Sequence, residues 1–236
     1  MINSELGRSI RLAKITAEQL YDSEQESKKN KAQYWGIYQR DFESYHKYFK
    51  LKGVDITPFV NSLSERGDVP LVLDLLADTS CIRSVENAQG VSVGLCDDRT
   101  YEARLGDRDH RRYMVEGSVF DVRTLRDVDK LRKIKWPDRG FDLVLERGHG
   151  GTNSYLPTSG LLKGLMNKIY RMTNPSGSLM CLCLPDDSRI LWDAAIYASH
   201  LNKHEALCCG VYRNVFALQR FDGSPALLPA PTDYSE

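Results

Sequence analysis

Residues 71–75 read Leu-Val-Leu-Asp-Leu, and they begin the part of the chain whose pattern decides the fold. From Val69 onward, short runs rich in Leu and β-branched residues alternate with segments of helical pattern. This alternation predicts a parallel sheet whose strands are joined by crossover helices. The predicted strands are residues 71–75, 91–95, 112–116, 141–146, 178–184, 205–209 and 214–219, and helices are expected near 160–173 and over 188–201.

The last two predicted strands are joined by the short segment from Gly210 to Arg213. A helical crossover does not fit into so few residues, so we expect these strands to pair as an antiparallel hairpin or as near neighbours. The sum is an α/β fold, a Rossmann-like three-layer sandwich with a mostly parallel sheet and a C-terminal antiparallel strand.

The region before the sheet has a different character. Residues 1–66 contain no convincing strand and are rich in Lys, Glu, Gln and aromatic residues at helical spacing, which predicts a helical N-terminal extension or lid. Residues 67–222 form the Rossmann domain in this reading, and the Pro-containing residues 223–236 form a flexible tail. One aromatic stripe follows helical spacing, and it predicts either core packing or a lid over the strand ends: Tyr34, Tyr38, Phe42 and Tyr45.

Composition limits the kinds of partner. The 236 residues carry 32 Lys and Arg against 32 Asp and Glu, so no global field attracts nucleic acid or an anionic membrane. The N-terminus lacks an apolar signal core and no apolar run approaches the roughly 18 residues that span a bilayer, so we expect a cytoplasmic protein without membrane partners. Among the six cysteines, Cys181 and Cys183 are separated by one residue, which is not a zinc-binding spacing, and we expect reduced, mostly buried thiols and no metal site.

Five segments at the strand ends resemble those of class I S-adenosylmethionine-dependent methyltransferases. The one most like the family reads Pro-Asp-Arg-Gly-Phe-Asp-Leu-Val over residues 137–144, and it is similar to the family's P-D-x-x-F-D-L-V lead-in to strand four. Each segment is weak alone, but the five in this order and spacing are together fairly specific, and they cover about residues 69–220. The segments are residues 72–80, 94–98, 116–121, 136–144 and 174–179.

The resemblance implies S-adenosylmethionine as the cofactor, and it implies that residues at the ends of three strands line the cofactor site. An acid after strand two would accept two hydrogen bonds from vicinal ribose hydroxyls, and small residues after strand three would let backbone amides approach the adenine. The alternatives are that the acids cap the following helix and that the small residues form an ordinary turn. The implied cofactor residues are Asp74, Leu75 and Ala77, then Asp97 and Asp98, then Gly117, Ser118 and Val119.

The first loop departs from the family pattern. Leu76, Asp78 and Ser80 stand where the family has glycines, which allow a close backbone approach and an open turn. Asp78 also puts a negative charge near the expected position of the cofactor carboxylate, and Arg83 is the candidate cation that would offset it. The loop therefore either binds the cofactor in a modified way or does not bind it.

The loop after strand four is the candidate reaction centre. Residues 146–153 read Glu-Arg-Gly-His-Gly-Gly-Thr-Asn, and Glu146 and His149 are candidates to take a proton from a small or medium-sized acceptor. A flexible turn is the alternative reading of this loop. For the whole chain, the main rival is a non-catalytic methyltransferase-like binding module, and a nicotinamide-dependent oxidoreductase is a weaker third hypothesis because it needs the missing glycines even more.

Overall fold

A computed structural model of the chain describes residues 41–75, 80–85, 87–94, 111–116, 122–146, 159–184 and 188–229. Within these residues, seven strands form one sheet in the order β3-β2-β1-β4-β5-β7-β6. Strands β1 to β5 are parallel to their neighbours, whereas β7 runs antiparallel to both β5 and β6. The strands are β1 (Leu71–Leu75), β2 (Gln89–Gly94), β3 (Arg112–Glu116), β4 (Leu143–Glu146), β5 (Gly177–Cys183), β6 (Leu207–Tyr212) and β7 (Val215–Phe221).

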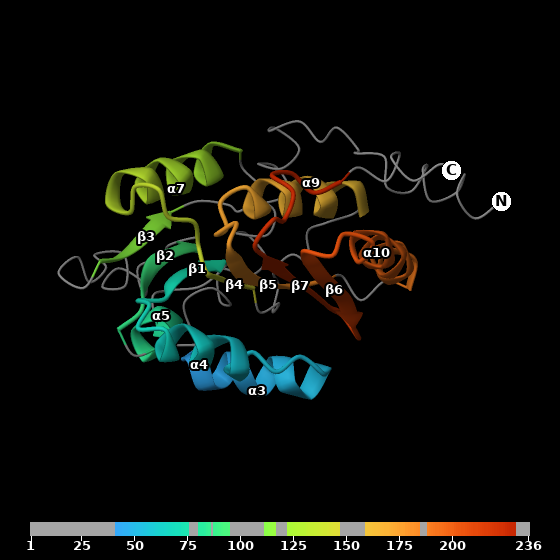
Figure 1. The fold of residues 1–236 in the computed structure, drawn as a ribbon, viewed down its shortest axis with the longest axis horizontal. Helices are drawn as coiled ribbons and strands as arrows, with labels where there is room; N and C mark the ends of the chain where they lie inside the picture. Colours follow the sequence, from blue (N-terminus) through green and yellow to red (C-terminus); the bar gives the residue numbers. More distant parts are fainter. Residues whose placement is uncertain are drawn as a thin grey trace, which may run out of the picture.

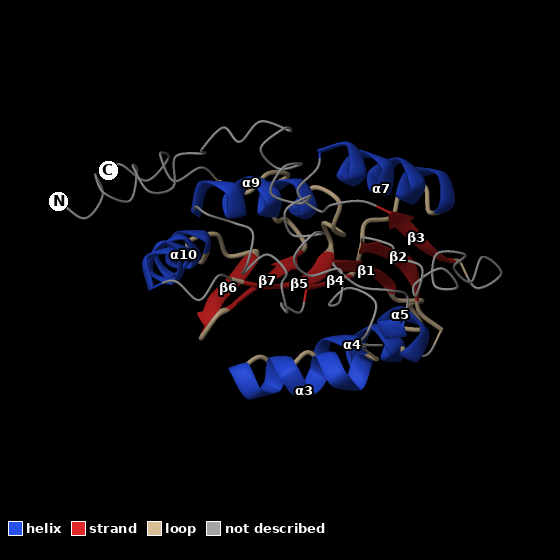
Figure 2. Ribbon diagram, turned by 180° about the vertical axis from the view of Figure 1, so that it is seen from behind, coloured by secondary structure: helices blue, strands red, loops and turns tan. Residues whose placement is uncertain are grey.

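Helices cover both faces of the sheet (Figure 1). One layer contains α3 (Phe42–Lys52), α4 (Thr57–Glu65) and α5 (Ser80–Ser84), and the view from behind shows the same separation into layers (Figure 2). The other layer contains α7 (Val122–Lys135), α9 (Ser159–Tyr170) and α10 (Ser188–Leu201). The predicted Rossmann-like three-layer sandwich with an antiparallel C-terminal strand is therefore confirmed.

Each face of the sheet has its own apolar core. Along β1, Leu71, Leu73 and Leu75 pack in the cluster beneath α7, α9 and α10, while Val72 packs with α3, α4 and α5 on the other face. Successive side chains of a strand point to opposite faces, so Asp74 lies on the same face as Val72. Burial on both faces explains why the strands read as nearly continuous apolar runs.

The predicted antiparallel hairpin at the C-terminal end of the sheet is confirmed, but its strands have other bounds than expected. Strand β6 begins at Leu207 and continues to Tyr212, so Gly210 lies inside the strand and does not begin the connection. The turn consists of Arg213 and Asn214, and Arg213 adopts the left-handed region with φ 56°. A two-residue turn needs this conformation to match the twist of the strands.

The predicted aromatic stripe enters the described part of the chain at helix α3, which carries Phe42 and Tyr45. Asp41 is extended, with φ −68° and ψ 168°, and its carboxylate accepts a hydrogen bond from the Ser44 amide, so α3 begins at Phe42. Tyr45 and Phe49 of this helix are completely buried against the sheet. Tyr34 and Tyr38 lie outside the described residues.

The free edge of strand β6 is closed by a side chain. The Asn202 carboxamide donates to the carbonyl oxygen of Cys209 at 2.7 Å and accepts from the Cys209 amide at 2.6 Å. These are the contacts that a neighbouring strand would make, so Asn202 protects an edge that would otherwise invite pairing with another chain. No helix within the described ranges is long and apolar enough to cross a membrane.

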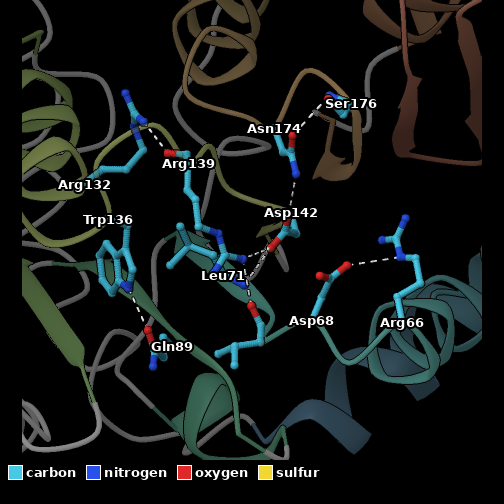
Figure 3. Close-up of polar contacts among 11 residues, drawn as sticks. Arg66, Asp68, Leu71, Gln89, Arg132, Trp136, Arg139, Asp142, Asn174 and Ser176 are labelled. Atoms are coloured by element: carbon cyan, nitrogen blue, oxygen red, sulfur yellow. Dashed lines mark hydrogen bonds and ion pairs between the residues drawn. The ribbon is translucent and has the colours of Figure 1, made fainter.

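A single carboxylate joins three strands at the amino edge of the sheet (Figure 3). Asp142 is 2% exposed, and one of its oxygens accepts from the Leu71 amide at 2.9 Å and from Arg139 at 3.0 Å. The other oxygen accepts from the Asn174 side chain at 2.8 Å. Asp142 therefore holds the start of β1, the start of β4 and the turn into β5 in one place, and it belongs to the motif at residues 137–144.

Gly140, in the same motif, is required by a close backbone approach. A Cβ atom at this position would lie 2.3 Å from the carbonyl carbon of Thr173, which real structures do not tolerate. The close approach lets Phe141 form its bridge to Thr173 beside Asp142.

We expect Asp142→Asn to lower the free energy of unfolding by about 3 kcal/mol, the scale for breaking a buried charged network. Asparagine keeps one acceptor oxygen but turns an NH₂ group toward either the Leu71 amide or the Asn174 side chain. Denaturant unfolding followed by circular dichroism measures the change.

Asp68→Asn is the matched control, because the Asp68 and Arg66 side chains pair at 3.1 Å while both are more than half exposed. Surface pairs of this kind contribute at most about 1 kcal/mol. Equal losses in the two variants would contradict the role of Asp142.

Candidate functional site

The carboxyl edge of the sheet contains a point where the strand order reverses. From β1 the chain proceeds to β2 and β3 on one side, and from β4 it proceeds to β5 on the other side. Ligands of open α/β sheets bind outside the carboxyl ends of the strands at such a switch point. In register, Leu75 at the end of β1 lies opposite Glu146 at the end of β4.

Asp74 near the end of β1 is fully buried and hydrogen-bonded to helix α3. The phenol of Tyr45 on α3 donates a 2.7 Å hydrogen bond to Asp74 Oδ1, and neither residue has any exposed surface. A hydrogen bond to the ionised form favours the charged carboxylate, which burial alone would disfavour.

Glu146, the last residue of β4, is also fully buried. Its Oε2 atom accepts a 2.7 Å hydrogen bond from the backbone amide of Cys183 at the end of β5. Glu146 thus fixes the ends of two neighbouring strands, and it lies at the edge where the sequence predicts the reaction centre.

Tyr48 approaches the same strand ends, one helical turn after Tyr45. Its hydroxyl lies 3.2 Å from the Cys183 Sγ atom. Burial raises the pKa of Tyr48 far above its ordinary value, and the Cys183 thiol and the charge of Glu146 raise it further. The phenol of Tyr48 therefore stays protonated, and α3 presents two phenols to the ends of β1 and β5.

The structure describes three of the predicted site residues. Asp74 and Glu146 lie at the carboxyl edge, while Leu75 has its side chain in the apolar core beneath α7, α9 and α10. The remaining ones lie outside the described residues: Ala77, Asp97, Asp98, Gly117, Ser118, Val119 and His149.

The altered first loop is described only at its far end. Leu76 and Asp78 lie outside the described residues, Ser80 begins helix α5, and Arg83 is exposed on that helix. Among the residues that the structure describes, no group of three or more His, Cys, Asp or Glu side chains is arranged to hold a metal ion.

Sequence reasoning missed the contacts that α3 makes with the strand ends. The residue types could have indicated these contacts, because Tyr45 and Tyr48 are tyrosines at positions where phenylalanine would fill a core equally well. A buried tyrosine usually has a partner for its hydroxyl. The identity of those partners, 29 and 135 residues away in sequence, required the fold.

A hollow lies on the flank of the sheet, between the α3–α4 connection and strands β6 and β7. It has a volume of about 430 Å³. Its wall includes the Asp55 carboxylate, which already accepts from the Thr57 amide and pairs with Lys50 at 3.7 Å. The hydrogen bond from Thr57 is the main reason that the pKa of Asp55 is lowered. This hollow does not open at the switch point.

The described cysteines differ in access to solvent. Cys208 is exposed, whereas Cys81, Cys181, Cys183 and Cys209 are buried, and none of these five forms a disulfide. Burial raises the pKa of the Cys181 and Cys209 thiols, which lowers their thiolate fraction at neutral pH.

We expect iodoacetamide to alkylate Cys208 well before the four buried cysteines, because the thiolate is the reacting species and Cys208 is accessible. Mass spectrometry of digested protein after timed labelling measures each rate, with unfolded protein as the control in which all five react. Labelling of Cys183 as fast as Cys208 would mean that α3 does not cover the end of β5.

Comparisons with known proteins give likenesses of structure. No family model and no curated protein matches the sequence. A crystal structure of monomeric WbdD is 15% identical, with a TM-score of 0.42 over 73% of this chain. A crystal structure of human N-acetylserotonin methyltransferase in complex with SAM is 16% identical, with a TM-score of 0.46 over 94% of this chain.

A third likeness is to a crystal structure described as a ribosomal RNA methyltransferase from Plasmodium falciparum. It is 10% identical, with a TM-score of 0.38 over 74% of this chain and 97% of that protein. The chain spans 42% of the WbdD chain and 66% of the N-acetylserotonin methyltransferase chain. These likenesses are distant, and it is the chain's own strand order and strand directions that show the Rossmann-like α/β fold.

Proposed function

We propose that the chain is an S-adenosylmethionine-dependent methyltransferase that acts on a small or medium-sized acceptor. One observation carries the proposal: the two strands that flank the switch point, β1 and β4, each bring a fully buried carboxylate to their carboxyl ends, Asp74 and Glu146. The negative charge of these two carboxylates at a ligand-binding edge suits a positively charged ligand, which would offset part of the cost of burying them.

The chemistry of these residues fits the cofactor. S-adenosylmethionine supplies a methyl group on a positively charged sulfur, and it also carries an ammonium group. Carboxylates at the ends of β1 and β4 suit such a cation electrostatically. In this proposal Asp74 lies beside the amino-acid end, Asp97 and Asp98 hold the ribose hydroxyls, and Gly117, Ser118 and Val119 flank the adenine.

Methyl transfer requires little of the protein beyond holding the acceptor in line with the methyl group and, where needed, accepting a proton. We assign proton acceptance to His149, whose ordinary pKa is near neutrality. The contacts of Glu146 favour positioning, because its carboxylate is buried and bonded to the backbone of Cys183.

A non-catalytic binding module is the second candidate, and one observation favours it. The first loop lacks the family's glycines. Titrating the purified chain with S-adenosylmethionine in a calorimeter separates the two candidates, since a module that has lost the cofactor site releases no heat of binding.

We expect replacement of both Asp97 and Asp98 by alanine to weaken binding of S-adenosylhomocysteine by about ten- to a hundred-fold. A charged hydrogen bond contributes about 1.5–3 kcal/mol, which corresponds to that change in affinity. Isothermal calorimetry measures it, and Asp127→Ala, an exposed position on α7, is the control. Unchanged affinity in the double variant would remove the ribose assignment.

Two substitutions separate proton transfer from positioning. His149→Ala should lower kcat by about 10²–10⁴-fold if His149 takes a proton from the acceptor. Glu146→Gln keeps an oxygen that accepts from the Cys183 amide, so it tests the charge of Glu146 alone. Transfer of labelled methyl groups to a panel of small acceptors measures both, and a larger loss in Glu146→Gln would reverse the two roles.

A further inference from the structure

Helix α3 holds both ends of the loop that joins β1 to α5. At one end, the Tyr45 hydroxyl donates to Asp74, the penultimate residue of β1, at 2.7 Å. At the other end, the Phe42 amide donates to the Ser84 hydroxyl of α5 at 2.5 Å. This loop, residues 76–79, is the one in which the sequence lacks the glycines of the family pattern.

The two contacts differ in burial. Phe42 and Ser84 bond near the surface, whereas Tyr45 and Asp74 have no exposed area. Tyr45 is held in place by Phe49, whose ring centroid lies 6.1 Å away, and by the caps of α3 at Asp41 and Gly53. The direction of the Asp74 carboxylate is therefore set by a rigid donor from another element.

We propose that Tyr45 is a positioning residue of the cofactor site, which orients and keeps ionised the Asp74 carboxylate for the cofactor's ammonium group. This inference rests on the proposed function. In a chain whose first loop has lost its glycines, the helix before the sheet takes over the fixing of the strand end. Helix α3 is then a part of the cofactor site, and not only a cover of the core.

The surroundings of Asp74 contain several groups that also titrate. Opposite the end of β1 lies Glu146, and on the other side Ser92 of β2 pairs in register with Asp74 and carries no charge. Titratable side chains on the neighbouring elements include Tyr45 and Tyr48 on α3, Cys81 and Arg83 on α5, Glu146 on β4, and Cys181 and Cys183 on β5. Helix α3 also carries Glu43, His46, Lys47, Lys50 and Lys52.

The test compares two phenol deletions in the full chain. Tyr45→Phe removes the donor to Asp74, and Tyr170→Phe removes an equally buried phenol that donates to the Pro225 carbonyl at 2.7 Å. Tyr170 ends α9 near the opposite edge of the sheet. We expect S-adenosylhomocysteine to bind Tyr45→Phe about ten- to a hundred-fold more weakly at neutral pH, and Tyr170→Phe as tightly as the original chain.

The pH profile of affinity distinguishes positioning from general loosening. Without the phenol donor, the pKa of Asp74 rises, so a larger share of Asp74 is protonated at a given acidic pH. Affinity for a cation is lost as pH falls through that pKa, and the loss should therefore begin at a higher pH in Tyr45→Phe than in the original chain. Tyr170→Phe should keep the original profile.

Asp74→Asn gives a second measurement should Tyr45→Phe fold poorly. This variant keeps an oxygen that can accept from the Tyr45 hydroxyl. It should bind S-adenosylhomocysteine weakly, and titration of residue 74 should cause no further loss of affinity at acidic pH. Suppose that the original chain binds S-adenosylhomocysteine. Equal affinity and an equal pH profile in Tyr45→Phe, or an equal loss of affinity in Tyr170→Phe, would then overturn this inference and leave the proposed function intact. If the original chain does not bind it, the proposed function fails and the inference falls with it.

Discussion

The sheet depends on the carboxylate of Asp142. Its two oxygens accept hydrogen bonds from the Leu71 amide, the Arg139 guanidinium and the Asn174 side chain. These three donors belong to three different parts of the chain. Because β1, β4 and β5 start from this point, the positions of their other ends are set as well. The motif at residues 137–144 therefore fixes the sheet at its amino edge, which is opposite the edge of the candidate functional site.

Buried acids at the two edges of the sheet have different surroundings. Asp142 at the amino edge is saturated by donors, including a cation. Asp74 and Glu146 at the carboxyl edge each have a neutral donor, a phenol for one and a backbone amide for the other. An arginine beside a carboxylate largely neutralises it, as Arg139 does for Asp142, whereas a phenol or a backbone amide brings no opposing charge. The same residue type thus serves folding at one edge and is suited to binding at the other.

Much of the fold was predictable from the sequence. Strands β1 and β3 and helix α10 match the predicted residues 71–75, 112–116 and 188–201. For β1 the reason is that a strand covered on both faces leaves a nearly continuous apolar run. The antiparallel pairing of the last two strands was predictable, but the position of the turn was not, because Arg213 and Asn214 lack glycine and Arg213 takes a left-handed conformation that its residue type does not indicate. The start of α3 depended on a cap at Asp41 that a stripe of aromatic residues conceals.

The candidate site was predictable only as a set of strand ends. Asp74 and Glu146 stand out because each is an acid near the end of an apolar run. Their partners Tyr45 and Cys183 lie 29 and 37 residues away in sequence, and only the three-dimensional arrangement joins them.

The contacts of the Asn202 carboxamide affect which proteins can bind at the β6 edge of the sheet. The carboxamide makes the two hydrogen bonds that a neighbouring strand would make at Cys209. A peptide strand that extends the sheet at β6 would first have to displace both of them, so β6 binds such a peptide poorly. Designed binders or fusion tags that work by sheet extension should fail on this side of the protein. Attachment through the outer surface of α10, where Trp192 is 65% exposed, would not meet that obstacle.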